Sequence, residues 1–258
     1  SPGNKIAKSD TKLKTCKVDV NTFIPIVITN EWEEYFKSPV CHHDKTIKRG
    51  IQLGKRLLSR LKNRNTVKQD IFENLKKGKL NRQKIYSAPF NENIFYRVEK
   101  ENFKDTFIHI SLDLSGSMQG LKLEKTLQTA VAIAYTACYL KNFDVEISVR
   151  GTTDERKTQP RPLLAYVFNS KKHSLKELYK LAYLRTNGMT PEGVCLHEIR
   201  KSLPKPSYYQ DVFLLNISDG LPNINSSQYN FSTAVNHTAK VIRNYKKDGI
   251  GVLSYFIS

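Results

Sequence analysis

Three short stretches of this sequence place oxygen-bearing side chains next to apolar runs. Asp113-Leu-Ser115-Gly-Ser117 ends one apolar run, Asn187-Gly-Met-Thr190 precedes a helical pattern, and Ser218-Asp219-Gly220 ends a second apolar run. A hard divalent cation binds carboxylate and hydroxyl oxygens, and Mg²⁺ takes them in near-octahedral geometry at about 2.0–2.1 Å. These loops contain no histidine or cysteine, which disfavours zinc. The pattern predicts a Mg²⁺ site, with Mn²⁺ or Ca²⁺ as alternatives, formed by Asp113, Ser115, Ser117, Thr190 and Asp219.

The two predicted carboxylates also set an expectation for stability. Two carboxylates close together repel each other when no cation lies between them. We therefore expect that replacing Asp113 by alanine leaves the metal-free protein no less stable than the original.

The same residues argue against catalysis by this chain. Ser115 lacks the Gly-x-Ser-x-Gly setting of a hydrolase nucleophile, and no histidine is placed beside it. His109 lies in the middle of a strand pattern and is expected to be a core residue with satisfied hydrogen bonds. The chain has no Gly-x4-Gly-Lys-Ser/Thr loop for ATP. We expect a protein that is not an enzyme itself.

From residue 107 onward, apolar strand patterns alternate with helical ones. Near-continuous apolar strands separated by helices predict an α/β fold: a doubly wound, mainly parallel sheet with helices on both faces. In such a sheet, ligands bind beyond the carboxyl ends of the strands, where the predicted metal ligands lie. Strands are expected at 107–113, 143–151, 162–169, 211–220 and 250–258, and helices at 121–140, 174–184, 191–202 and 231–249.

The first 106 residues have a different composition. Residues 1–20 are polar and lysine-rich and are expected to form a basic tail or strap. Residues 44–61 predict an amphipathic helix with a basic outer face, and 93–100 a strand. Because residues 21–106 hold too few apolar side chains for a core of their own, we expect a helical and strand extension that packs as an accessory layer on a domain at 107–258.

The chain is strongly basic. It carries 42 Lys and Arg against 24 Asp and Glu, a net charge of +18, and residues 1–106 hold 23 of the former and 12 of the latter. Such an excess attracts nucleic acid or an acidic protein surface. The alternative is a solvated face that only keeps the protein soluble.

Four cysteines show no Cys-x-x-Cys spacing. An intracellular, reducing setting is the simplest interpretation, either the cytoplasm or an organelle if a targeting segment has been removed. No run approaches the roughly 20 apolar residues of a membrane span, and no signal peptide is visible.

The order Asp-x-Ser-x-Ser, then Thr190 in a glycine-containing loop, then Ser-Asp-Gly resembles the von Willebrand factor A (vWA) domain with its metal-ion-dependent adhesion site. The resemblance covers residues 107–258. It implies that Ser115 and Ser117 bind the metal directly, that Thr190 does so directly or through water, and that Asp113 and Asp219 act through bound waters. Because such domains continue with another strand and a helix, we expect the C-terminal end of this domain to be incomplete.

The preceding segment resembles the lead-in of the cobaltochelatase subunit and its relatives. The element Gly-x-Leu-[Asp/Asn]-x3-[Leu/Ile] is filled by Gly78, Leu80, Asn81 and Ile85, with asparagine where aspartate is commoner. This resemblance implies a non-catalytic subunit whose bound metal accepts a carboxylate from a partner protein. The partner is expected to be a MoxR-type AAA+ ATPase, in a chelatase-like or protein-remodelling complex.

One alternative belongs to a different class. The chain is then a nucleic-acid- or ribonucleoprotein-associated protein, in which the basic N-terminal half contacts phosphate and the vWA domain docks a protein. Against it, no RNA-reading motif with paired aromatic residues is visible. An adhesion module is disfavoured by the excess of lysine and the lack of a signal peptide.

Overall fold

The computed structural model describes residues 23–64, 69–100, 105–153, 160–206, 208–209, 211–224, 229 and 231–257. The expected tail at 1–20 lies outside the described residues. Within those ranges, no helix is both long enough and apolar enough to cross a membrane.

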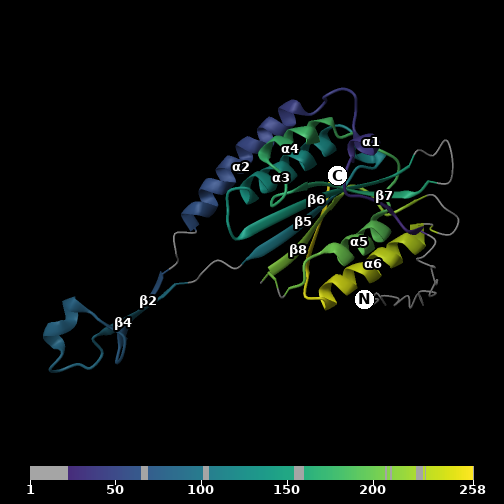
Figure 1. Cartoon of the computed structure of the whole chain (residues 1–258). Coiled ribbons are helices and arrows are strands. Elements are labelled where there is room, and N and C mark those ends of the chain that lie inside the picture. The colour runs from purple at the N-terminus through teal and green to yellow at the C-terminus, as the bar shows by residue number, and fades with distance from the viewer. Residues whose placement is uncertain are drawn as a thin grey trace, which may run out of the picture.

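A six-stranded sheet forms the centre of the protein (Figure 1). Its strand order is β1-β7-β6-β5-β8-β9; β5, β6, β8 and β9 run parallel, whereas β7 is antiparallel to β6. These elements confirm the predicted α/β fold with a doubly wound, mainly parallel sheet. The strands are β1 (Ile26–Ile28), β5 (Thr106–Asp113), β6 (Phe143–Thr152), β7 (Pro162–Asn169), β8 (Asp211–Ser218) and β9 (Gly251–Phe256).

Helices cover both faces of this sheet and bury different residues of the same strands. Side chains alternate between faces along a strand. Ile110 and Leu112 of β5 therefore pack in the core on the side of α3 (Leu121–Ala137) and α4 (Leu175–Lys180). Phe107 packs in the second core, under α5 (Glu192–Ser202) and α6 (Phe231–Lys247).

The second face also carries a buried polar row. His109, Ser111 and Asp113 alternate along β5 with no exposed surface, and the paired strand β6 contributes Ser148 and Arg150, equally buried. A buried polar group must find a hydrogen-bond partner or lose stability. The partners of these side chains position the candidate site.

The N-terminal segment consists of a part that packs on the main sheet and a part that does not. β1 pairs with β7 at one edge of the main sheet, and α2 (Asp44–Arg64) packs along α3. The short helix α1 (Glu33–Phe36) buries Phe36 in the core under α3 and α4. The described residues up to 64 therefore pack on the main sheet and on α3.

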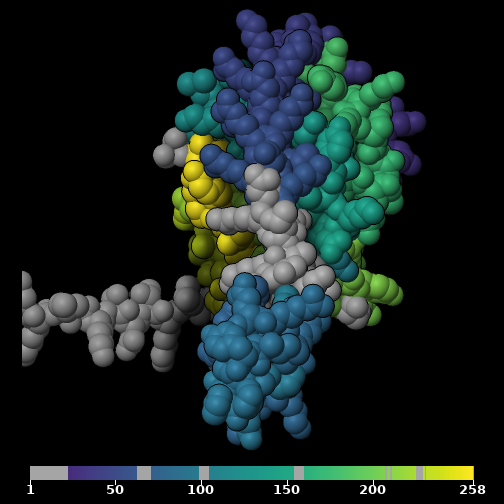
Figure 2. All heavy atoms as spheres, turned by 90° about the vertical axis from the view of Figure 1, so that its left-hand side faces the viewer, coloured from purple at the N-terminus to yellow at the C-terminus, as the bar shows by residue number. Residues whose placement is uncertain are grey.

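Residues 69–100 instead form a small lobe apart from the main sheet (Figures 1 and 2). Its three-stranded sheet has the order β2-β4-β3, with Gln69 of β2 opposite Lys100 of β4. Large apolar side chains stay exposed here, including Ile71, Tyr86 and Phe90. We expected residues 21–106 to form a single accessory layer on the domain. Residues 69–100 do not belong to such a layer, because their large apolar side chains do not pack in the domain core. Its elements are β2 (Gln69–Leu75), β3 (Lys79–Leu80), a 3-10 helix (Arg82–Ser87) and β4 (Phe95–Lys100).

Two glycines allow α2 to approach α3 closely. A Cβ atom on Gly50 would lie 2.9 Å from the Val131 Cβ and 3.0 Å from the Gln128 carbonyl oxygen. A Cβ atom on Gly54 would lie 2.8 Å from the Tyr135 Cβ atom and 2.9 Å from the carbonyl oxygen of Ala132. Because backbone carbonyls cannot rotate out of the way, only a residue without a Cβ atom fits at this crossing.

This contact gives a test of the helix pairing. Alanine favours an isolated helix over glycine by about 1 kcal/mol. We nevertheless expect Gly54→Ala to lower the free energy of unfolding by about 1–3 kcal/mol, because the helices must separate. Urea unfolding of the whole chain measures the change, with Ser59→Ala on the exposed side of α2 as the control. A Gly54→Ala protein as stable as the original would contradict the close crossing.

Candidate functional site

Asp113 is the last residue of β5, and its carboxylate joins two neighbouring strands. Its Oδ1 accepts the backbone N–H of Ser115 at 2.9 Å. Its Oδ2 accepts the hydroxyl of Ser218, at the end of β8, at 2.7 Å. Asp113 is fully buried, so these bonds fix its carboxylate at the carboxyl ends of adjacent parallel strands.

Two serines connect this carboxylate to the second predicted acid. The Ser115 and Ser117 hydroxyl oxygens lie 3.1 Å apart, and the Ser117 hydroxyl donates to Asp219 Oδ1 at 2.7 Å. A 3-10 turn at Gly116–Met118 holds the serines, with Met118 fully buried beneath it. The structure therefore brings four of the five predicted residues into one hydrogen-bonded group.

Thr190 reaches this group through the backbone of its loop. The Gly116 N–H donates to the Gly188 carbonyl at 3.0 Å, and the Asn223 N–H, beyond β8, donates to the Thr190 carbonyl at 3.0 Å. Gly188 has φ +68°, and a Cβ atom there would lie 1.9 Å from the Thr152 hydroxyl oxygen. The loop therefore needs glycine to pass this close. All five predicted residues lie on loops that contact one another.

Sequence reasoning missed a lysine in this group. Lys122 Nζ donates to Asp219 Oδ2 at 2.9 Å; the Lys122 side chain is 35% exposed and that of Asp219 only 1%. Lys122 lies in the first turn of α3, where a positive charge opposes the helix dipole. Its position right after the serine motif was visible in the sequence, but its partner is 97 residues away.

Lys122 changes the expectation for Asp113. The negative charge of the site is already opposed by an ammonium group, so little repulsion remains to be relieved when Asp113 is removed. Its loss instead leaves the Ser115 N–H and the Ser218 hydroxyl without their acceptor. Because unpaired buried donors are costly, Asp113→Ala is now expected to destabilise the metal-free protein.

A buried ion pair fixes the start of α5 beside Thr190. Arg150 is fully buried and donates from Nη1 to the Ser111 hydroxyl at 2.7 Å. Its Nη2 lies 3.8 Å from Glu192 Oε1, which also accepts a hydrogen bond from the Asn216 amide. Glu192 is two residues beyond Thr190, so this pair positions the threonine loop against the sheet.

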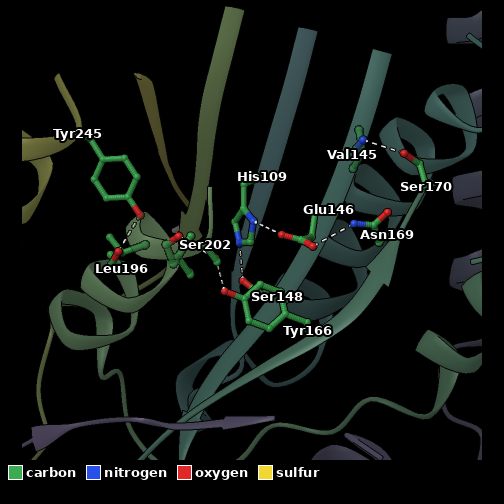
Figure 3. A network of polar contacts seen from close by, with 11 residues as sticks. His109, Val145, Glu146, Ser148, Tyr166, Asn169, Ser170, Leu196, Ser202 and Tyr245 are labelled. Carbon is green, nitrogen blue, oxygen red and sulfur yellow. Dashed lines mark hydrogen bonds and ion pairs between the residues drawn. The ribbon is translucent and has the colours of Figure 1, made fainter. Parts of the chain in front are cut away.

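His109 lies at the centre of a second polar network (Figure 3). Its Nε2 lies 2.8 Å from the Ser148 hydroxyl and its Nδ1 3.2 Å from Glu146 Oε2, while Asn169 donates to Glu146 Oε1 at 3.0 Å. Burial raises the pKa of Glu146, but the hydrogen bonds from His109 and Asn169 outweigh it and lower the pKa overall. The prediction of a satisfied core histidine is confirmed.

Serine, histidine and glutamate in this order are also the components of a nucleophile, its base and an orienting acid. Ser148 and His109, however, have no exposed surface. The ring of Tyr166 lies edge-on to His109, with centroids 5.9 Å apart. No substrate can reach the serine in this arrangement, so the network holds the strands together rather than forming an active site.

In the described part of the chain, other side chains that bind metals do not gather elsewhere. Among the described residues, no group of three or more His, Cys, Asp and Glu side chains could hold a metal ion. The sequence Cys-His-His-Asp at 41–44 forms no such group. Its Asp44 carboxylate instead pairs with Lys48, with 2.7 Å between Oδ2 and Nζ. The Asp113 group differs from such clusters, because it combines two carboxylates with the hydroxyl groups of Ser115 and Ser117.

Comparison with known proteins found likeness only among solved structures. No family model matches the sequence, and no curated protein matches it. The pilus adhesin SpaC of Lactobacillus rhamnosus GG, in its open conformation, aligns over 60% of this chain and 24% of its own, with 15% identity and a TM-score of 0.43.

Two other solved structures are similar over about half of the chain. The PilB minor pilin of Streptococcus sanguinis, in a mutant form, covers 48% of this chain and 32% of its own, with 16% identity and a TM-score of 0.35. The vWF domain of the type V pili tip protein Mfa5 of Porphyromonas gingivalis covers 47% and 40%, with 16% identity and a TM-score of 0.33. The chain thus spans 24% to 40% of the length of these three structures. Its fold class rests on the strand order and helix placement described above.

Proposed function

We propose that this chain is a non-catalytic, vWA-type interaction protein that binds Mg²⁺ and uses it to bind a carboxylate of a partner protein. The metal ligands are Asp113, Ser115, Ser117, Thr190 and Asp219. One observation carries the proposal: the Ser117 hydroxyl meets the Asp219 carboxylate across 102 residues of sequence, at the carboxyl ends of adjacent strands. That edge of an open α/β sheet is where ligands bind.

The geometry of the oxygen atoms supports this assignment. Two ligands on neighbouring corners of an octahedron around Mg²⁺ lie about 2.9 Å apart, given metal–oxygen distances of about 2.0–2.1 Å. The Ser115 and Ser117 hydroxyl oxygens are separated by 3.1 Å. A bound Mg²⁺ would supply the positive charge that attracts a partner's carboxylate, while the five residues hold and orient it.

The partner that we propose rests on the second resemblance. We propose a MoxR-type AAA+ ATPase, in a chelatase-like or protein-remodelling complex inside the cell. The support is the sequence element at Gly78, Leu80, Asn81 and Ile85, which lies in the lobe at 69–100. Leu80 and Ile85 are exposed there, where a partner can contact them.

A second candidate function is favoured by the surface of the lobe and of α2. Tyr86 is 81% and Phe90 92% exposed. Exposed aromatic rings next to basic side chains are the features that bind single-stranded nucleic acid. α2 runs across the face shown in Figure 2. The exposed basic residues of these two regions include Lys45, Lys48, Arg49, Lys55, Arg56, Arg60, Lys76, Lys77, Lys79 and Arg82.

The metal proposal predicts a specific loss in the Asp113→Ala variant. Mg²⁺ should raise the thermal unfolding midpoint of the original protein, because a ligand of the folded state stabilises it, and EDTA should reverse the rise. Asp113→Ala should not respond to Mg²⁺, and without metal it should lose about 1–3 kcal/mol of stability. Asp211→Ala, at the opposite end of β8, removes the same charge and should keep the Mg²⁺ response. An unchanged response in Asp113→Ala would refute the assignment.

The nucleic-acid candidate makes a different prediction. Binding of a fluorescent single-stranded RNA should weaken steeply with salt and ignore EDTA, because it depends on phosphate contacts. A double replacement, Tyr86→Ala with Phe90→Ala, should cost about 1–3 kcal/mol for each lost stacked base. Fluorescence anisotropy measures both effects, with Tyr208→Ala, an exposed tyrosine outside the lobe, as the control. RNA binding that is equal in the double variant and the control would exclude this surface.

A further inference from the structure

Lys122 supplies a positive charge to the candidate metal site from within the chain. Both oxygens of Asp219 are engaged, Oδ1 by the Ser117 hydroxyl and Oδ2 by the Lys122 ammonium group. We propose that Lys122 is a built-in competitor of the divalent cation, which neutralises Asp219 in the metal-free protein and lowers the affinity of the site for Mg²⁺. This inference rests on the proposed function, because it concerns the same site.

The burial of Asp219 explains why an internal cation is needed. Its side chain is only 1% exposed, and an ionised carboxylate so far removed from water is costly unless a charge or a metal compensates it. The Asp113 carboxylate belongs to the same hydrogen-bonded group. Lys122 therefore allows the folded protein to hold the carboxylates of Asp113 and Asp219 close together when no metal is bound.

The position of Lys122 in its helix shows that the contact is specific. In the first turn of α3 its charge opposes the helix dipole, so helix stability alone does not favour a lysine there. Lys125, three residues later, is exposed and lines an apolar groove with Leu215 and Tyr255 instead. The two lysines share one helix and one charge, but of the two it is Lys122 that the structure places on Asp219.

Electrostatic repulsion predicts that Lys122 lowers the affinity of the site for Mg²⁺. A divalent cation that uses Asp219 must either displace the ammonium group or bind with a like charge only a few ångströms away, and like charges at such distances repel each other strongly. Both routes weaken binding. A neutral side chain at residue 122 should therefore raise the affinity for Mg²⁺ by about tenfold, which corresponds to about 1.4 kcal/mol.

Three variants of the whole chain separate charge from shape. Lys122→Met removes the ammonium group and keeps an unbranched side chain, Lys122→Arg keeps the charge, and Lys125→Met removes the same charge from the next lysine along the helix. Isothermal titration with MgCl₂, after removal of metal, gives each affinity. We expect about tenfold tighter binding for Lys122→Met, and values within about twofold of the original protein for the other two.

Thermal unfolding provides a second, independent measurement. In EDTA, Lys122→Met should unfold at a lower temperature than the original protein, because Asp219 has lost its counter-ion. Saturating Mg²⁺ should raise its unfolding temperature by more than it raises that of the original protein, because the ligand binds more tightly. Lys125→Met should show neither change.

The outcomes distinguish this proposal from the one on which it rests. If the original protein binds Mg²⁺ and Lys122→Met binds it equally well, the competitor role is wrong and the metal site stands. Weaker binding by Lys122→Met would also overturn it, because Lys122 would then orient Asp219 for the metal. If neither the original protein nor any variant binds Mg²⁺, the proposed metal-dependent function itself fails.

Discussion

The arrangement of the candidate site depends on one buried hydrogen bond, between the Asp113 carboxylate and the Ser218 hydroxyl. It joins the ends of β5 and β8 at the point where the sheet's connections diverge, with β6 on the other side of β5. A carboxylate in this position has no access to water, so its partners must be fixed by the fold. The serine turn, the threonine loop and Asp219 are all placed relative to that strand pair.

The row of buried polar residues behind Asp113 connects the site to the rest of the domain. Arg150 and Glu192 connect the sheet to the start of α5, and His109 connects β5 to β6 through Ser148 and Glu146. Buried polar groups of this kind contribute little net stability compared with an apolar core, but they permit few alternative arrangements. The site therefore lies on a rigid support and does not depend on its loops alone.

Sequence reasoning identified the α/β class, because the alternation of apolar strands and helices is a local pattern. It also singled out five oxygen-bearing residues that lie on contacting loops in the structure, because each stands at or near the end of an element. It did not identify Lys122, Arg150 or Glu192 as part of the site, since their partners are distant in sequence and the strand register decides which side chains meet. The separation of the lobe at 69–100 was missed for another reason: composition does not show where apolar side chains remain exposed.

The antiparallel pairing of Gln69 with Lys100 has a consequence for how this protein can change. Because the first and last residues of the lobe lie opposite each other in one antiparallel ladder, the lobe is an insertion that closes on itself. An insertion of this kind can be lengthened, replaced or deleted without shifting the register of β5 or the position of Asp113. One scaffold can therefore carry different lobes while the side chains at the sheet edge keep their arrangement.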